Sequence, residues 1–597
     1  MSLTIHLLGR PRLERSTGEA YRFRSRKSWA LLAFLILNDH PPTRSQLASL
    51  LFADADDPLR ALRWSLSEIR RGLGDEGSLD GDPVVLHLED TAIDVRVVAR
   101  GSWQDAVGLP DLGATLLDGV AIRGVPAFES WLLSQQRHVA GTTEAILHEA
   151  AIGSTSTGET RAALDYAIRA STLSPTDENH QALLIRLYRL LGDDVAAEEQ
   201  YRACARVLAA ELGIAPGPAV HAALRETRLR TASPADPASV AAILEAGSAA
   251  VAAGAVEAGV QSLRTAVRLA DATDGTALRI RSRVVLGEAL IHSLRGHDEE
   301  GMAALHQAHA IAVEVGDATA VAHAGAELGY VDFLRARYER AETWLTAAIT
   351  AAAGSASIIA KATGYLGSVE SDLGNYAGAL DHLATACDLA RATGDPRREA
   401  YGRSMLGRMA LLRGHLDLAA EHLDASIALA EGDHWLALVP WPQALRGEVQ
   451  LARGDTGGAT LLLDQAFARA CQLGDPCWEG TAARGLAMVA DATGDHDRAF
   501  ALLAEARTRC NRLADPYVWL DCHILDAQCE VGLRHGHVDT AHWIDAMQAL
   551  AARTGMRELI VRSLLHGAAL GHDGDARAAA LMAADIDNPL LHARFDG

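Results

Sequence analysis

Apolar residues recur at helical spacing through most of the chain, and beyond about residue 245 the whole pattern repeats every forty residues. Three small or apolar positions mark the repeat: Gly374, Gly414, Gly454 and Gly494; Ala379, Ala419, Ala459 and Ala499; Leu383, Leu423, Leu463 and Leu503. A period of this length is typical of helix pairs that stack into an array. The pattern therefore predicts an α-solenoid over residues 246–597.

The recurring residue types indicate how each helix pair packs. A Leu-Gly pair in the first helix, such as Leu366-Gly367 or Leu406-Gly407, and recurring alanines in the second place small side chains where the two helices cross closely, while the leucine fills the gap between neighbours. The turn glycines suit positive φ, and Gly-Asp pairs such as Gly394-Asp395 end one repeat and cap the next. This pattern resembles the tetratricopeptide repeat, in the lengthened form found in bacterial transcriptional regulators.

Such an array offers a concave face, built from its first helices, that binds a peptide, a protein or a small molecule. The sequence does not choose among these three kinds of ligand. Aromatic residues of the first helices are candidates for lining the face, with packing in the core as the alternative: Tyr401, Trp435, Trp441, Trp478 and Trp519.

The first hundred residues follow a different pattern. Two short alternating runs, 3–13 and 20–24, predict a hairpin, with Ser16-Thr17-Gly18 between them. Helical spacing follows over 29–37, over 44–51 after Thr43 as N-cap, and over 58–73 after Asp57 as N-cap. Runs 84–88 and 92–95 then predict two strands. Three helices followed by two strands predict a winged helix over residues 1–100.

The third of these helices has two contrasting faces. We expect Leu59, Leu62, Leu66, Ile69 and Leu73 to face the core. The opposite face and its flanks carry cations, a tryptophan and a serine, which suit phosphates, base edges and thymine methyl groups. Together with an arginine that begins the preceding helix, they are the predicted DNA-binding residues: Arg44, Arg60, Arg63, Trp64, Ser67, Arg70 and Arg71. The alternative is a solvated arginine-rich helix with Trp64 packed under the wing.

Charge and composition narrow the class of protein. The 597 residues carry a net charge of -22, yet the first 75 contain twelve Lys and Arg against eight Asp and Glu. The basic segment is therefore the one that carries the predicted recognition helix. No apolar run reaches the roughly 18 to 20 residues of a membrane span, and no signal peptide is apparent. We therefore expect a cytoplasmic protein without a membrane partner.

Several motifs together resemble a known family. Leu7-Leu8-Gly9, Trp29-Ala30-Leu31-Leu32 and Arg44-Ser45-Gln46-Leu47 look like the OmpR-type winged helix of the SARP-type antibiotic regulatory proteins. In that family a bacterial transcriptional activator domain follows, and here Trp131 and the run 208–216 (LAAELGIAP) resemble its pattern. The chain departs from that pattern at Thr176-Asp177 and Gln181-Ala182.

The resemblance implies an order of domains and a function. The order is a winged helix over 1–100, a helical activator domain over 101–230, a linker rich in Ala, Ser and Pro over 231–245, and the array over 246–597. The function implied is activation of transcription by a homo-oligomer that binds tandem direct repeats in double-stranded promoter DNA and contacts RNA polymerase. The alternative is an adaptor that binds no DNA and works through its array. The sequence specifies neither the target promoters nor activation as against repression.

Chemistry of other kinds finds no support in the sequence. A nucleotide switch of the P-loop kind needs a lysine under a glycine-rich turn, but the lysines of this chain are Lys27 and Lys361, and neither stands in such a motif. The seven cysteines form no CxxC pair, so they predict neither a zinc site nor a disulfide framework. We therefore predict no cofactor and no enzymatic activity.

Overall fold

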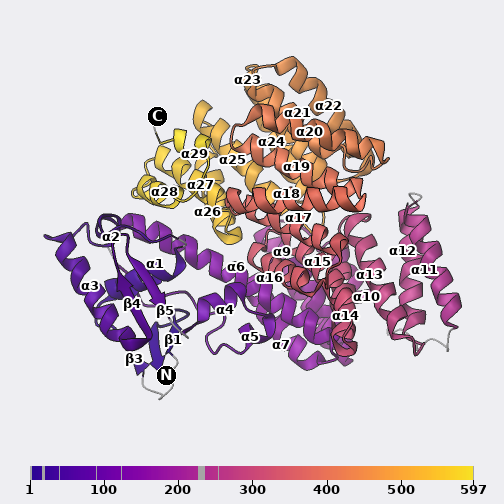
Figure 1. The fold of residues 1–597 in the computed structure, drawn as a ribbon, viewed down its shortest axis with the longest axis horizontal. Coiled ribbons are helices and arrows are strands. Elements are labelled where there is room, and N and C mark those ends of the chain that lie inside the picture. The colour runs from indigo at the N-terminus through magenta and orange to yellow at the C-terminus, as the bar shows by residue number, and fades with distance from the viewer. Residues whose placement is uncertain are drawn as a thin grey trace. The chain divides into compact units, whose positions relative to one another are not determined.

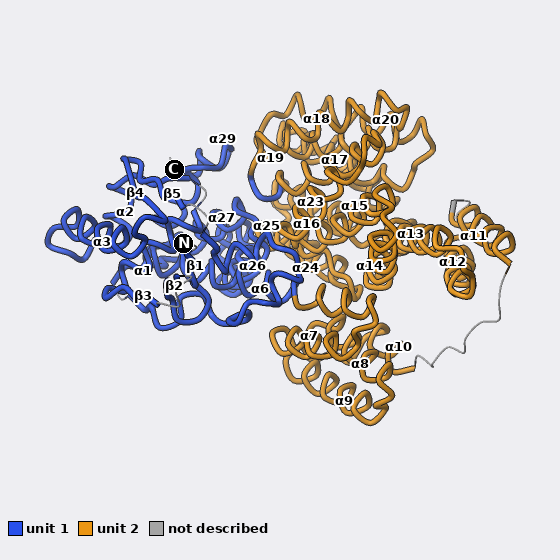
Figure 2. Tube along the Cα trace, turned by 60° about the horizontal axis from the view of Figure 1, so that its bottom comes forward, with its two compact units in different colours: residues 1–146, 372–374, 528–597 blue, residues 147–371, 375–527 orange. Residues whose placement is uncertain are grey.

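The computed structural model describes residues 3–15, 20–38, 40–88, 91–122, 124–225, 236–252 and 255–595. A short segment with strands comes first along the chain and helices follow it (Figure 1). The chain forms two compact units (Figure 2): residues 1–146, 372–374 and 528–597 make the first, and residues 147–371 and 375–527 the second. Every helix of the described residues is too short or too polar to cross a bilayer.

The predicted winged helix is confirmed at the start of the first unit. Helices α1 (Arg26–Leu37), α2 (Arg44–Leu51) and α3 (Pro58–Leu73) pack on one another around fully buried leucines such as Leu47 and Leu51. Four short strands form one sheet in the order β3-β2-β1-β6: β1 (Leu3–His6), β2 (Arg12–Arg15), β3 (Ala20–Tyr21) and β6 (Thr91–Ile93). Strands β4 (Gly77–Asp80) and β5 (Val85–Leu88) form a separate antiparallel hairpin, the wing.

The prediction of the two wing strands was half right. The run 84–88 does enter the wing as β5, but the run 92–95 supplies β6, which pairs in parallel with β1 instead, Ile5 opposite Ile93. The next residue explains this pairing, because both carboxylate oxygens of Asp94 accept hydrogen bonds from the backbone N–H of Leu7 at 2.9 and 3.0 Å. Residues 16–18, the predicted turn of the first hairpin, lie outside the described residues.

One residue of the predicted core stripe of α3 was also placed wrongly. The side chain of Leu59 is 52% exposed, because this first turn of α3 has not yet reached the hydrophobic core. A polar residue is buried beside the stripe instead. The carboxylate of Glu68 accepts hydrogen bonds from the backbone N–H of Arg24 at 2.8 Å and from the hydroxyl of Ser28 at 2.6 Å.

Helices continue from residue 94 to residue 225. Asp177 and Asp193 cap two of them by accepting backbone hydrogen bonds, and Gly192 ends one with a φ of 83°. The helices are α4 (Asp94–Arg100), α5 (Trp103–Val107), α6 (Pro126–Ser156), α7 (Thr160–Leu173), α8 (Glu178–Leu191), α9 (Asp194–Glu211) and α10 (Pro218–Arg225). Helix α6 contributes its residues up to 146 to the first unit and the remainder to the second.

The predicted helix-pair array is confirmed from α11 onward. Its helices are α11 (Pro237–Ala252), α12 (Val256–Ala270), α13 (Thr276–His292), α14 (Asp298–Val315), α15 (Ala318–Leu334), α16 (Tyr338–Ala351), α17 (Ala356–Asp372), α18 (Tyr376–Thr393), α19 (Pro396–Leu412), α20 (Leu416–Gly432), α21 (Pro440–Ala452), α22 (Thr456–Leu473), α23 (Pro476–Ala492), α24 (His496–Cys510), α25 (Val518–His535), α26 (Thr540–Thr554), α27 (Arg557–Ala569) and α28 (Asp575–Ala583), followed by the short α29 (Pro589–Ala593). The array is shared between the units, since residues 372–374 and everything from 528 onward belong to the first.

The same glycine contact recurs in the helix pairs from α13 and α14 to α21 and α22. A Cβ added to Gly367 would lie 2.7 Å from Cγ of Leu383, and one added to Gly407 would lie 2.6 Å from Cγ of Leu423. Carbon atoms cannot approach this closely, so only glycine allows the two helices of a pair to cross here. The turn glycine Gly374 has a φ of 79°, as its role in the turn predicts.

The predicted linker over 231–245 does not have those bounds. Residues 226–235 lie outside the described residues, but α11 already begins at Pro237 and runs through 245. Proline is compatible with the first turn of a helix, where its missing N–H would have no intrahelical partner, so Pro237 begins the helix. The helical array therefore starts earlier than the composition of this segment predicted.

Candidate nucleic-acid interface

Helix α3 is fixed by its caps and by its apolar face. The carboxylate of Asp57 accepts a hydrogen bond from the backbone N–H of Arg60 at 2.9 Å, and Pro58 occupies the first turn. Leu62, Leu66 and Ile69 are at most 1% exposed. Because three buried side chains at helical spacing fix the rotation of the helix, its opposite face points outward.

The residues predicted to bind DNA from α3 all lie on the exposed part of the helix. Trp64 is 55% exposed, which contradicts the alternative that it packs under the wing. The arginines and the serine of this face are exposed as well: Arg60, Arg63, Ser67, Arg70 and Arg71. Leu59 joins this exposed set, which the periodicity had not predicted. Leu59 lies in the first turn of α3, before the turns that pack on the core, and this position could have identified it as exposed.

Not all of these arginines are equally free to reach a ligand. Among the described residues, Arg60, Arg63 and Arg71 form no ion pair with a carboxylate. Arg70 is engaged, because its Nε and Nη2 donate to the backbone carbonyl of Leu79 in β4 at 3.0 and 2.6 Å. Arg70 thus ties the helix to the wing.

Arg44 is engaged with the wing in the same way. Its backbone N–H donates to Oδ1 of Asp82 at 2.8 Å, and its Nε donates to the carbonyl of Gly81 at 3.1 Å. Thr43 and Gln46 close a reciprocal capping box around the start of α2. Two of the seven predicted residues, Arg44 and Arg70, therefore hold the wing beside α2 and α3. The carbonyls that receive them could not be read from the sequence, since any backbone offers them.

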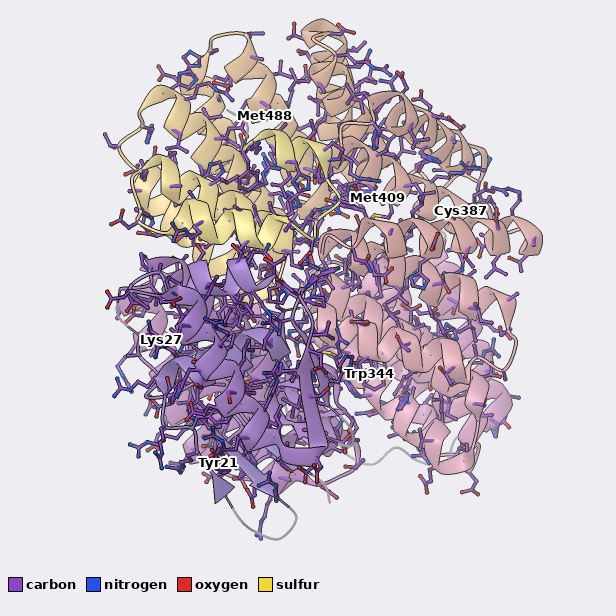
Figure 3. All side chains as sticks on the ribbon, turned by 60° about the vertical axis from the view of Figure 1, so that its left-hand side comes forward. Tyr21, Lys27, Trp344, Cys387, Met409 and Met488 are labelled. Carbon is purple, nitrogen blue, oxygen red and sulfur yellow. The ribbon has the colours of Figure 1, made fainter. Side chains whose placement is uncertain are left out.

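Next to α3, the connection between α2 and α3 is acidic. Lys27 of α1, labelled in Figure 3, pairs with Asp54 and lies 5.3 Å from the ring centroid of Phe52. The paired lysine lowers the pKa of Asp54. Asp56 and Asp57 are exposed in the same connection. An acidic connection therefore borders the positively charged outward face of α3.

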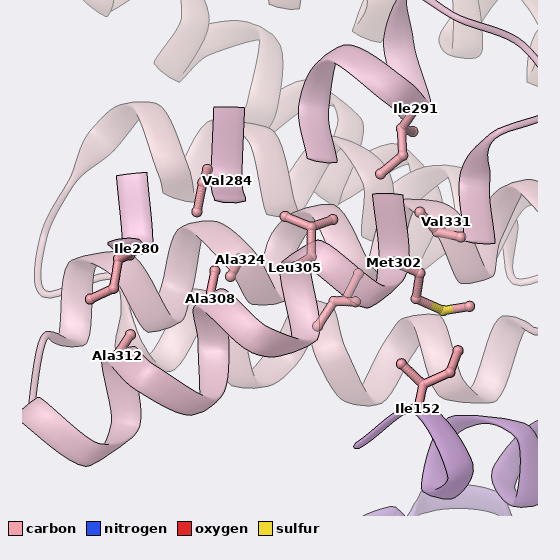
Figure 4. Packing of buried hydrophobic residues seen from close by; sticks show 11 residues of the cluster. Ile152, Ile280, Val284, Ile291, Met302, Leu305, Ala308, Ala312, Ala324 and Val331 are labelled. Atoms are coloured by element: carbon pink, nitrogen blue, oxygen red, sulfur yellow. The ribbon is translucent and has the colours of Figure 1, made fainter. Parts of the chain in front are cut away.

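The second unit holds α6 and α8 against the array. Ile152 of α6 belongs to a buried cluster with Met302 and Leu305 of α14 and Val331 of α15 (Figure 4). Leu183 of α8 packs against the same cluster. The helices that follow the winged helix in the chain are therefore part of the core of the first repeats, and this was not predicted.

Buried ion pairs accompany this apolar contact. Nη2 of Arg340 lies 2.8 Å from the carboxylate of Glu149, with side-chain exposures of 2% and 6%. His148 lies 2.9 Å from Glu299, which also pairs with Arg335. Burial alone would raise the pKa of Glu299, but Arg335 and His148 outweigh it and hold that pKa well below its ordinary value.

The first unit binds the other half of α6. Nη2 of Arg553 in α26 lies 2.7 and 2.9 Å from the two carboxylate oxygens of Glu144, and the hydroxyl of Ser130 donates to Asp575 of α28 at 2.9 Å. Gly141 permits the approach, since a Cβ there would lie 2.7 Å from Cγ of Arg553. The C-terminal repeats therefore pack on the helix that follows the winged helix.

Comparison with known protein families identifies one segment of the chain. Residues 88–228 match the bacterial transcriptional activator domain. The resemblance to the SARP-type regulators is confirmed. The matched range begins at β5 of the wing and ends beyond α10, so it starts earlier than the predicted residue 101. No curated protein matches the chain.

Several solved structures are similar in part. A Rap protein complexed with competence and sporulation factor is 12% identical, covering 60% of this chain and all of its own, with a TM-score of 0.44. Mycobacterium tuberculosis EmbR in complex with a low affinity phosphopeptide is 20% identical over 37% of this chain and 64% of its own, with a TM-score of 0.30. Yeast Tom70 is 11% identical over 82% and 90%, with a TM-score of 0.33. Because all three TM-scores lie below 0.5, none of these likenesses supports a conclusion on function.

The matched activator domain, which follows the winged helix, indicates a transcriptional regulator.

Proposed function

We propose that this regulator binds promoter DNA in a sequence-specific manner through α3, and that the wing contacts the adjacent sugar-phosphate backbone of the DNA. The observation that carries the proposal is the outward face of α3, where Trp64 is exposed and Arg60, Arg63 and Arg71 form no ion pair with any residue that the structure describes. Guanidinium groups donate to phosphates and to guanine edges, and a flat apolar ring suits thymine methyl groups. An otherwise acidic chain restricts binding of DNA to this face.

Two further parts of the proposal follow from the activator domain. The protein would act as an activator, in which two copies occupy direct repeats and contact RNA polymerase, with the array sensing a ligand or a protein. The matched activator domain supports this reading.

The test is capture of genomic DNA fragments by the full-length protein, followed by titration of the recovered sites at several salt concentrations. Specific binding predicts recovered sites with a repeated element, and an affinity that falls with salt in proportion to the phosphates contacted. Recovery of no enriched sequence would overturn the proposal and leave the adaptor function, in which the array is the working surface.

A further inference from the structure

The first helices of three consecutive repeats bring three tryptophans together. Trp441 of α21 lies 5.1 Å, between ring centroids, from Trp478 of α23 and 5.8 Å from Trp519 of α25. Trp441 and Trp519 are 4% and 7% exposed, whereas Trp478 is partly exposed. All three were candidates for lining the face that the first helices build, and the structure collects them in one place.

The indole N–H groups of this tryptophan cluster are unequally satisfied. Nε1 of Trp441 donates to the hydroxyl of Ser404 in α19 at 3.2 Å. Nε1 of Trp478 and Nε1 of Trp519 are buried, and neither has a hydrogen-bond acceptor among the described residues. Buried indole N–H groups normally find an acceptor, because leaving one unpaired forfeits its hydrogen bond to water. Two indole N–H groups, in rings that both contact Trp441, therefore lack acceptor oxygens among the described residues.

A cation borders the same rings. The guanidinium carbon of Arg408 in α19 lies 5.3 Å from the ring centroid of Trp519, and Nη2 of Arg408 lies 3.0 Å from Nε2 of His523 in α25. Arg408 is 4% exposed. Flat rings and a cation from α19, α21, α23 and α25 therefore lie together in this part of the array.

We propose that the tryptophan cluster binds a planar aromatic compound that carries carbonyl or carboxylate oxygens. A flat ring stacks on the indoles, and its oxygens accept the hydrogen bonds that Trp478 and Trp519 have to offer. The partly exposed Trp478 marks the side from which the compound enters. This proposal supplies the ligand of the sensing role within the proposed function, but it is tested without DNA, so either can fail alone.

A second buried indole in the same unit provides the matched control. Nε1 of Trp344 in α16 is also buried, and among the described residues it has no hydrogen-bond acceptor and its ring contacts no second tryptophan. Its ring centroid lies 5.5 and 5.1 Å from those of His306 and His309, in edge-to-face arrangements. Trp344→Phe removes the same kind of donor from another place in the array. Any effect of indole removal on folding alone should appear in this variant as well.

The experiment is calorimetric titration of the full-length protein with 2-naphthoate, and with 2-naphthylmethylamine, which has the same rings but a cationic donor in place of acceptor oxygens. We expect saturable binding of the acid and little binding of the amine. Trp519→Phe and Trp478→Phe keep an aromatic ring but lose the N–H, so each should weaken binding of the acid by about 5-fold or more. Trp344→Phe should bind it like the parent.

Three results would overturn the proposal. One is the absence of saturable binding of 2-naphthoate up to about 1 mM, which would make the cluster an ordinary part of the core. Another is equal binding of acid and amine, which would show apolar contact without use of the donors. The last is equal weakening in Trp344→Phe and Trp519→Phe, which would place the effect in stability of the fold.

Discussion

Arginines occur in two contrasting settings in this molecule. On α3, Arg60, Arg63 and Arg71 are exposed and form no ion pair among the described residues. Where α6 meets the array, Arg335 and Arg340 are buried and each faces a carboxylate. A buried cation must be paired to offset its desolvation, whereas an exposed cation without a carboxylate is available to an external anion. The first setting therefore suits the proposed binding of DNA, whereas the second stabilises the fold, and substitutions should separate the two.

The largest loss of stability is expected from Arg340→Ala. The variant leaves Glu149 buried without its cation, which costs about 3 to 5 kcal/mol in the free energy of unfolding. Urea unfolding followed by circular dichroism measures it. The double variant Arg340→Met with Glu149→Leu should regain most of the loss, since a buried ion pair replaced by apolar groups is close to neutral. Equal losses in both variants would show that packing, and not the unpaired charge, is responsible.

A smaller loss of stability is expected from Gly407→Ala, at a close crossing of two helices in the array. Gly407→Ala places a Cβ 2.6 Å from Cγ of Leu423, so the two helices must separate, at a cost of about 1 to 3 kcal/mol. Gly432→Ala is the matched control, because nothing lies within 4 Å of its added Cβ. Thermal unfolding of both variants is the measurement. A Gly407→Ala variant as stable as Gly432→Ala would mean that the close crossing does not specify the array.

The repeat array could be predicted because its contacts are local and recur. Each Gly–Leu contact, such as that of Gly367 with Leu383, joins the two neighbouring helices of a pair, so its residues recur at a fixed spacing along the sequence. Contacts between segments that are distant in the sequence and do not repeat produce no periodic pattern from which they could be predicted. Neither the parallel pairing of β6 with β1 nor the pairing of Arg340 with Glu149, 191 residues away, has a periodic signal.

The candidate DNA-binding site on α3 was also predicted in part from the sequence. The outward face of α3 followed from helical spacing, and Asp57 and Thr43 were identified as N-caps. What failed was the assignment of Leu59 to the core and the equal treatment of all the arginines. The sequence could not separate Arg70, which binds a wing carbonyl, from Arg71, because that difference depends on where the wing folds back.

A dependence on pH should be confined to the buried charges. Burial, with Asp515 adding repulsion, raises the pKa of Asp298 to about 7, and burial with Glu149 nearby raises that of Asp332 to about 7. Both groups hold their protons when folded but lose them near pH 4 when unfolded. The contribution of these two carboxyls to stability should therefore fall as pH rises from about 5 to 7, by about 1 kcal/mol or more, and it is opposed in part by His306, whose pKa burial lowers to about 3.

The test compares urea unfolding at these pH values. Carboxylates with lowered pKa, such as Glu299 and Glu300, lose their contribution only below about pH 4.5, so they do not oppose the trend in this window. Asp298→Asn should flatten the slope, and Asp497→Asn, an exposed position of α24, should not. A slope unchanged by Asp298→Asn would contradict the assignment.

The smallest change in stability is expected on the exposed face of α3. Arg60→Ala and Arg71→Ala remove side chains without a carboxylate partner, so the free energy of unfolding should stay within about 0.5 kcal/mol of the parent. Binding should respond strongly. Each lost base contact weakens it by about 1 to 3 kcal/mol, and each lost phosphate contact reduces the salt slope by about one unit. Leu66→Ala reverses the pattern, with a loss of about 2 to 5 kcal/mol in stability because it opens the core beneath the helix.

Arg70 and Arg71 give the closest comparison of a structural arginine with one available to DNA. They are neighbours in α3, but Arg70 donates to the carbonyl of Leu79. If it holds the wing, Arg70→Ala should weaken binding to all sequences alike, whereas a base-reading Arg71→Ala should change the sequence preference. Titration of each variant against a captured site and a mutated site, at two salt concentrations, distinguishes the two. Parent-like binding by both Arg60→Ala and Arg71→Ala would remove the recognition role from α3. The exposed arginines would then be a solvated surface, and the adaptor function would replace the proposed one.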